Sequence, residues 1–197
     1  MLFGPLPQPR PPGLRRRSLP VGTALWRIDA EAPAGWDWAG FPQPRHRFDS
    51  ATGAFRTRYA ATSAAGAARE RYVASGRYIP SDHRDHHLVR LVTTRRLGVL
   101  DLRTEANLDA LDVDDRISTA HDPEVWEASH HLADAVHRWW DDLDGLVYRS
   151  RTTPASAVNL AFFSLDPLAA QSWPLRSCVA ELDDLVLHHR FTIGFDY

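Results

Sequence analysis

The chain of 197 residues has the length of one compact domain, and its 44% hydrophobic and 24% charged residues are ordinary for a soluble globular protein. All 23 basic residues are arginine and the formal net charge is −2, so the positive balance typical of nucleic-acid-binding domains is absent. One cysteine excludes an intrachain disulfide, and no stretch approaches the ~20 apolar residues of a membrane span, so we expect a cytoplasmic protein that contacts neither membranes nor nucleic acid directly.

Residues 1–22 are rich in proline and arginine. Six prolines disfavour a regular helix or a central strand, because proline fixes φ and lacks a backbone N–H group. We therefore predict an extended N-terminal arm at 1–22 and a single domain at 23–197. The Arg15–Arg17 triplet is predicted to be a solvated tail, with contact to a partner or to nucleic acid as the alternative.

The first part of the domain alternates β-prone runs with loops and one helix. A long Gly/Pro/Trp-rich loop extends to about Pro44, and loops of this length often cover a ligand site. Ser63 is a suitable N-cap for an alanine-rich helix over 64–74. Strands are predicted at 23–28, 58–61, 87–93 and 97–102.

The second part contains the strongest helix signal, over 123–143. Asp122 is the predicted N-cap and Pro123 the first helical residue. Its apolar residues recur at helical spacing and predict one buried face: Val125, Leu132, Val136, Trp139, Trp140 and Leu143. A shorter helix is predicted at 105–111, and strands at 145–150, 158–164 and 184–191.

Two polar segments carry groups suited to chemistry. The first is Arg45-His-Arg-Phe-Asp49, with Tyr59 and Glu70 downstream, and the second is Tyr148-Arg-Ser-Arg151, with Asn159 downstream. Arginine, serine and asparagine donate hydrogen bonds to phosphate oxygens, tyrosine offers a ring face, and glutamate stabilises positive charge. The purely structural alternative is a salt bridge between Arg47 and Glu70, with Tyr148 and Ser150 merely ending a strand.

These segments, in their order and spacing, resemble the RES domain family, which is named for its Arg, Glu and Ser. The resemblance runs from about residue 23 to 164 and includes the gap of eleven residues from Tyr59 to Glu70. Its motifs are Leu25-Trp-Arg-Ile28, Arg47-Phe-Asp49, Gly53, Tyr59-Ala-Ala, Ala67-Ala-Arg-Glu70, Asp144-Gly-Leu-Val-Tyr-Arg-Ser-Arg151 and Asn159-Leu-Ala-Phe-Phe163.

The resemblance implies an α+β fold like that of ADP-ribosyltransferases, with a mixed sheet core flanked by helices. It implies an NAD-degrading toxin paired with an Xre-like helix-turn-helix antitoxin, with a homodimer or a larger complex as its assembly. The implied catalytic residues are Arg47, Tyr59, Glu70 and Ser150, and the implied NAD-binding residues are Arg27, Arg47, Tyr59, Ser150 and Asn159. Many relatives have Gly-Gly-Arg-Trp-Asn where this chain has Arg45-His-Arg-Phe-Asp49, so backbone approach to a phosphate differs here.

The reaction implied is cleavage of the nicotinamide–ribose bond, with water or inorganic phosphate as acceptor and no cofactor beyond NAD as substrate. The alternatives are ADP-ribosyl transfer onto a protein and a catalytically weak binding domain that uses Trp36-Asp-Trp38 as a contact surface. Glycine-rich Rossmann and P-loop motifs are absent. The histidines at 83, 86 and 87 match no standard metal-ligand spacing, so we expect a solvated loop there and no metal site.

Overall fold

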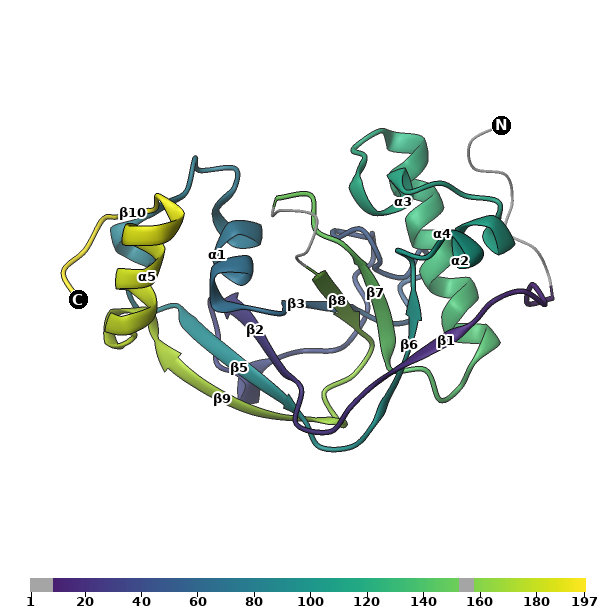
Figure 1. Ribbon diagram of the computed structural model, residues 1–197, viewed down its shortest axis with the longest axis horizontal. Helices are drawn as coiled ribbons and strands as arrows, with labels where there is room; N and C mark the ends of the chain where they lie inside the picture. The colour runs from purple at the N-terminus through teal and green to yellow at the C-terminus, as the bar shows by residue number, and fades with distance from the viewer. Residues whose placement is uncertain (1–8, 153–157) are drawn as a thin grey trace.

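An eight-stranded mixed sheet runs through the computed structural model, which describes residues 9–152 and 158–197 (Figure 1). In order across the sheet the strands are β1 (Arg16–Leu19), β6 (Leu97–Asp101), β7 (Gly145–Arg149), β8 (Val158–Phe162), β3 (Arg58–Ala61), β2 (Ala24–Asp29), β5 (His87–Thr93) and β9 (Leu168–Pro174). The neighbours β6 and β7 are parallel, and the other neighbouring pairs are antiparallel. A separate parallel pair joins β4 (Tyr78–Ile79) to β10 (Thr192–Ile193). The predicted α+β class is confirmed.

The helices gather at the two ends of the curled sheet (Figure 1). At one end lie α1 (Ala64–Tyr72) and α5 (Val179–His189), and at the other lie α2 (Glu105–Leu111), α3 (Arg116–Thr119) and α4 (Pro123–Trp139). Short 3-10 turns, labelled η1, η2 and η3, span Pro33–Gly35, Ser81–His83 and Leu175–Ser177. The central strands therefore lie between two helical layers.

Three hydrophobic clusters follow from the alternation of side chains along the strands. On β7, Leu146 and Tyr148 pack with α2, α3 and α4, while Val147 between them faces a second cluster on the other side of the sheet. On β3, Ala60 faces that same second cluster, whereas Ala61 joins a third one with α1 and α5. Burial on both faces explains why the central strands read as nearly continuous apolar runs.

The predicted start signals of two helices are present. The Ser63 hydroxyl accepts a hydrogen bond of 3.0 Å from Gly66 N at the start of α1, so the predicted N-cap is confirmed. Pro123 occupies the first turn of α4 and Asp122 is its N-cap residue, as predicted, although the Asp122 side chain makes no capping hydrogen bond. The predicted end of this helix at Leu143 is wrong, because the chain becomes extended at Trp140. Leu143 is still buried, in the turn that follows.

The strand predicted at 184–191 is wrong, because α5 occupies most of it. Leu182 and Leu185 lie three residues apart and are both buried, whereas Leu187 is 74% exposed. That spacing suits one helical face, while the apolar run Leu185–Leu187 imitates a strand. Strand β9 was not predicted, because its alanines and glutamine have low β propensity, yet it pairs with β5 over seven residues.

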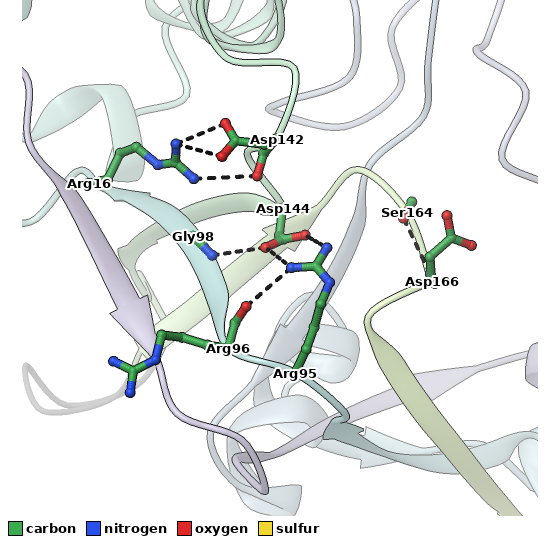
Figure 2. A network of polar contacts seen from close by, with 8 residues as sticks. All are labelled: Arg16, Arg95, Arg96, Gly98, Asp142, Asp144, Ser164 and Asp166. Carbon is green, nitrogen blue, oxygen red and sulfur yellow. Dashed lines mark hydrogen bonds and ion pairs between the residues drawn. The ribbon is translucent and has the colours of Figure 1, made fainter.

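The prediction of a solvated tail is wrong for the end of the N-terminal arm, because residues 16–19 form the edge strand β1. This strand contains no proline and pairs antiparallel with β6. Figure 2 shows Arg16 beside Asp142, to which its Nη1 donates at 2.8 Å. Arg17 pairs with Asp101 at 3.1 Å. Arg16 and Arg17 therefore bind aspartates of the domain itself.

Asp144, directly before β7, binds Gly98 on β6 and Arg95 in the loop before β6 (Figure 2). Asp144 Oδ2 accepts hydrogen bonds from Gly98 N at 2.8 Å and from Arg95 Nη1 at 3.0 Å, and its side chain is nearly fully buried. A Cβ atom at Gly145 would lie 2.1 Å from the carbonyl oxygen of Ala161 on β8. Glycine at 145 therefore permits close approach of β7 and β8.

Candidate functional site

A cavity of about 250 Å³ lies over the central strands, between the two helical layers. Its lining includes five of the six predicted site residues: Arg27 on β2, Arg47 before β3, Tyr59 on β3, Glu70 on α1 and Asn159 on β8. The sixth, Ser150, follows β7 and binds Glu70 at the edge of the cavity. Six residues spread over 133 positions of the sequence are thus brought to one place.

Glu70 is held at the cavity wall by two hydroxyl groups. Ser150 Oγ donates to Glu70 Oε1 at 2.6 Å, and Thr152 Oγ1 donates to the same oxygen at 2.5 Å. Hydrogen bonds to a carboxylate are roughly twice as strong as neutral ones, so they fix its orientation. The second oxygen, Oε2, accepts neither of these two bonds.

Arg47 crosses from the loop before β3 to α3. It donates to the carbonyl oxygens of Ile117 at 3.1 Å and Ala120 at 2.5 Å. The alternative of a salt bridge between Arg47 and Glu70 is therefore wrong: each has other partners. Burial lowers the pKa of Arg47, but a guanidinium remains a cation at neutral pH. Arg47 also lines the cavity, and these two bonds do not use all five N–H groups of its guanidinium.

The Tyr59 hydroxyl is used within the protein. It accepts hydrogen bonds from Phe48 N at 2.8 Å and from Thr57 Oγ1 at 2.8 Å. Burial raises the pKa of Tyr59, so the phenol is neutral at physiological pH. The ring also lines the cavity, with Tyr148 packed edge-on at a centroid distance of 6.1 Å. What Tyr59 offers a ligand is therefore its ring rather than an acidic or basic oxygen.

Arg27 is oriented by Asp29, two residues further along β2. Asp29 Oδ2 accepts from Arg27 Nε at 2.7 Å and from Arg58 Nη1 at 3.0 Å. Trp36 packs against both guanidinium groups. The centroid of its ring lies 5.6 Å from the guanidinium carbon of Arg27 and 4.6 Å from that of Arg58. Trp36 is only 8% exposed, so the suggestion that it forms part of a contact surface is wrong.

Several lining residues were not identified from the sequence. They are Trp26, Ser118, His121 and Trp126, together with Arg71 and His46, which adjoin predicted residues. Only Trp126 left a signal, since it is a large aromatic residue that falls off the buried stripe of α4. His46 and His121 come from loops and Ser118 from the short helix α3, whereas Trp26 on β2 and Arg71 on α1 are direct neighbours of the predicted Arg27 and Glu70. Periodicity does not reveal which of these positions line a cavity.

The charges of the lining suit an anionic ligand. Among the residues that the structure describes, four arginines, at 27, 47, 71 and 151, and one glutamate, at 70, line the cavity. Guanidinium groups bind phosphate oxygens through paired hydrogen bonds, and a fixed carboxylate stabilises a neighbouring positive charge. Within residues 9–152 and 158–197, no group of three or more His, Cys, Asp or Glu side chains is arranged to hold a metal ion.

The histidines predicted to lie in a solvated loop make specific contacts. The rings of His83 and His86 stack with centroids 3.8 Å apart, and His83 Nδ1 lies 3.2 Å from the Tyr72 hydroxyl.

In the part of the chain that the structure describes, no helix is both long enough and apolar enough to span a membrane.

Comparisons with known proteins agree with this architecture. The family model for the RES domain matches residues 24–182. A chain in the crystal structure of the M. tuberculosis MbcT–MbcA toxin–antitoxin complex has a similar fold, with a TM-score of 0.54 and 14% sequence identity over 84% of this chain and 90% of that chain. A search of curated proteins gave no significant match. At this identity, the structural likeness concerns the fold.

Proposed function

Because the chain belongs to the RES domain family, we propose that it is the toxin of a toxin–antitoxin pair and degrades NAD in the cytoplasm. The observation that carries the proposal is the lining of the cavity, where four arginines surround a single glutamate whose Oε1 is held by Ser150. NAD brings a pyrophosphate for the arginines and a positively charged nicotinamide ring, so both charges of the lining have a counterpart.

The reaction breaks the bond between nicotinamide and ribose. As nicotinamide leaves with the bonding electrons, positive charge develops on the ribose, and Glu70 is the carboxylate that stabilises it. Water as acceptor yields ADP-ribose and a proton, and inorganic phosphate yields ADP-ribose carrying a phosphate on the same carbon. Ser150 acts through Glu70, as a positioning residue.

The remaining residues bind and orient the substrate. Arg27 and Arg47 hold the pyrophosphate, the Tyr59 ring packs against the nicotinamide riboside, and the Asn159 amide bonds a ribose hydroxyl or the nicotinamide amide. Asp29 orients Arg27 before the substrate arrives, which reduces the entropy lost on binding.

The decisive experiment measures NAD loss by the purified protein, with and without inorganic phosphate. We expect consumption by the wild type and by Glu105→Gln, a matched change of an exposed helical glutamate, but not by Glu70→Gln or Arg47→Ala. Dependence on phosphate identifies the acceptor. Absence of NAD loss under every condition would contradict the proposal and favour transfer to a protein or a binding role.

The toxin role rests on family membership and on a structural neighbour that belongs to a toxin–antitoxin complex. We expect expression of the chain to arrest growth, and an Xre-like helix-turn-helix protein to relieve the arrest by binding it. Glu70→Gln should abolish toxicity while the protein accumulates normally. Equal toxicity of the wild type and Glu70→Gln would contradict a role based on this site.

A further inference from the structure

An open, shallow groove adjoins the cavity and is not used by the function proposed above. It is lined by His121, Pro123, Trp126, Glu127 and His130, at the start of α4 and in the loop before it. His121 and Trp126 line the cavity as well. The groove and the cavity are therefore two compartments that share a wall.

The shared wall is built from aromatic rings. His121 stacks on Trp126, with ring centroids 6.1 Å apart and an angle of 25° between the rings. His130 contacts the same indole in an edge-on arrangement, with ring centroids 5.8 Å apart. Desolvation and the charges of Arg151 and Arg47 lower the pKa of His121, so its ring is neutral at physiological pH. The groove thus presents flat, uncharged rings, the surface on which a nucleobase stacks.

Arg47 stands at the junction of the two compartments. Its guanidinium lies 5.0 Å from the centroid of the Trp126 ring and also faces the cavity. The cavity of about 250 Å³ is smaller than the roughly 300–1,000 Å³ usual for ligand sites, so it is small for a whole dinucleotide. We therefore expect a dinucleotide whose pyrophosphate binds Arg47 to extend one of its halves beyond the cavity.

We propose that the adenine ring of NAD binds in the groove, stacked on Trp126 and flanked by His121, while the nicotinamide riboside occupies the cavity. This inference rests on the proposed function and assigns the adenine half of the same substrate. The single glutamate of the groove, Glu127, is directed to solvent, with its side chain 75% exposed, and adenine carries no charge for it to repel. Stacking supplies affinity here without the hydrogen bonds that would read one particular base.

The test compares two probes that differ in the adenylate half. Dissociation constants for NAD and for nicotinamide mononucleotide are measured by calorimetry on the Glu70→Gln background, where the ligands should stay intact. Trp126→Ala should weaken NAD binding about 10-fold or more and should weaken mononucleotide binding at least about 3-fold less than that, because only NAD carries an adenine to stack on the indole, whereas both ligands contact the cavity wall and Arg47. Trp126→Phe should recover most of the NAD affinity.

Two further variants separate stacking from folding. Trp173→Ala removes an indole that is 40% exposed on β9, outside both compartments, and should leave both affinities unchanged. His121→Ala changes an exposed loop residue, so the variant should fold normally. Its affinity for NAD should fall a few-fold, and its affinity for the mononucleotide should not change.

Equal losses for the two ligands would mean that Trp126 supports Arg47 or the fold, and would overturn the inference while leaving NAD degradation intact. NAD binding that is unaffected by Trp126→Ala and His121→Ala would overturn it too. A wild-type protein that neither binds nor consumes NAD would instead refute the proposed function, and the adenine subsite with it.

Discussion

Ser150 and Glu70 are eighty residues apart in the sequence, and Ser150 Oγ donates a hydrogen bond of 2.6 Å to Glu70 Oε1. The bond joins the end of β7 to α1 beside the cavity that Glu70 lines. Thr152 donates to the same oxygen. The serine and the glutamate therefore form one hydrogen-bonded unit.

Ser150→Ala removes one of the two hydroxyl donors to Glu70. A hydrogen bond to a charged group contributes about 1.5–3 kcal/mol when buried, and Glu70 is exposed, so we expect the low end of that range, a loss in kcat of about 10-fold. The KM for NAD should change little, since Ser150 acts through Glu70. Steady-state kinetics of NAD consumption measure both constants. In the Ser150→Ala/Thr152→Val double variant the loss should exceed that of either single change; an unchanged kcat would show that the carboxylate needs neither hydroxyl.

Tyr59→Phe keeps the ring and removes the hydroxyl. Because that oxygen accepts from Phe48 N and Thr57 Oγ1, its loss leaves an amide unpaired, and we expect the free energy of unfolding to fall by about 2 kcal/mol. NAD turnover should stay within about 2-fold of wild type, whereas Tyr59→Ala should lose it. Urea denaturation and NAD consumption test the two effects. Tyr197→Phe, at an exposed position, is the matched control; loss of turnover in Tyr59→Phe would assign the hydroxyl a direct chemical role.

Asp29→Asn should destabilise the fold in a way that depends on pH. Burial opposes ionisation of Asp29, but the guanidinium groups of Arg27 and Arg58 outweigh it and lower the pKa of the carboxyl below its usual value. A depressed pKa stabilises the fold above the pKa of the unfolded chain, about 3.9, and that stabilisation is lost as the pH falls through the lower value of the folded state. We expect Asp29→Asn to reduce the free energy of unfolding by about 2 kcal/mol at pH 7 and by much less near pH 3.

Urea denaturation at pH 7, 5 and 3 measures this difference. Asp37→Asn is the control, since Asp37 is 62% exposed and its bond to Arg56 should contribute little at any pH. A difference between wild type and Asp29→Asn that is as large at pH 3 as at pH 7 would rule out the carboxylate as its origin.

Asp144→Ala should be more damaging than loss of its arginine partner. The Gly98 amide donates to the buried Asp144 carboxylate at 2.8 Å (Figure 2), and the change leaves this amide without an acceptor. We expect the free energy of unfolding to fall by about 1–3 kcal/mol. Arg95→Ala removes a side chain that is 56% exposed and should cost under about 1 kcal/mol. Both variants lie away from the cavity, so their affinity for NAD should match wild type. Equal destabilisation by the two variants would show that the ion pair, and not the amide bond, is what matters.

Local pattern predicted much of the fold. Strands β2, β3, β5, β6, β7 and β8 and helices α1, α2 and α4 were expected close to their observed bounds, because each has an apolar period or a cap within a few residues. Strand β9 and the edge strand β1 were missed, since their pairing partners, and not their own side chains, make them strands.

The sequence by itself determined the α+β class, the family and the identities of six candidate site residues, since motif order and spacing are properties of the chain. Only the tertiary structure decided which contacts those residues make: Ser150 binds Glu70, Arg47 binds the backbone of α3, and the Tyr59 hydroxyl bonds within the protein. It also brought Trp126 and His121 to the cavity wall. The physical reason is that these contacts join segments far apart in sequence, and they depend on the curl of the sheet and the packing of helices against it, which no local spacing encodes.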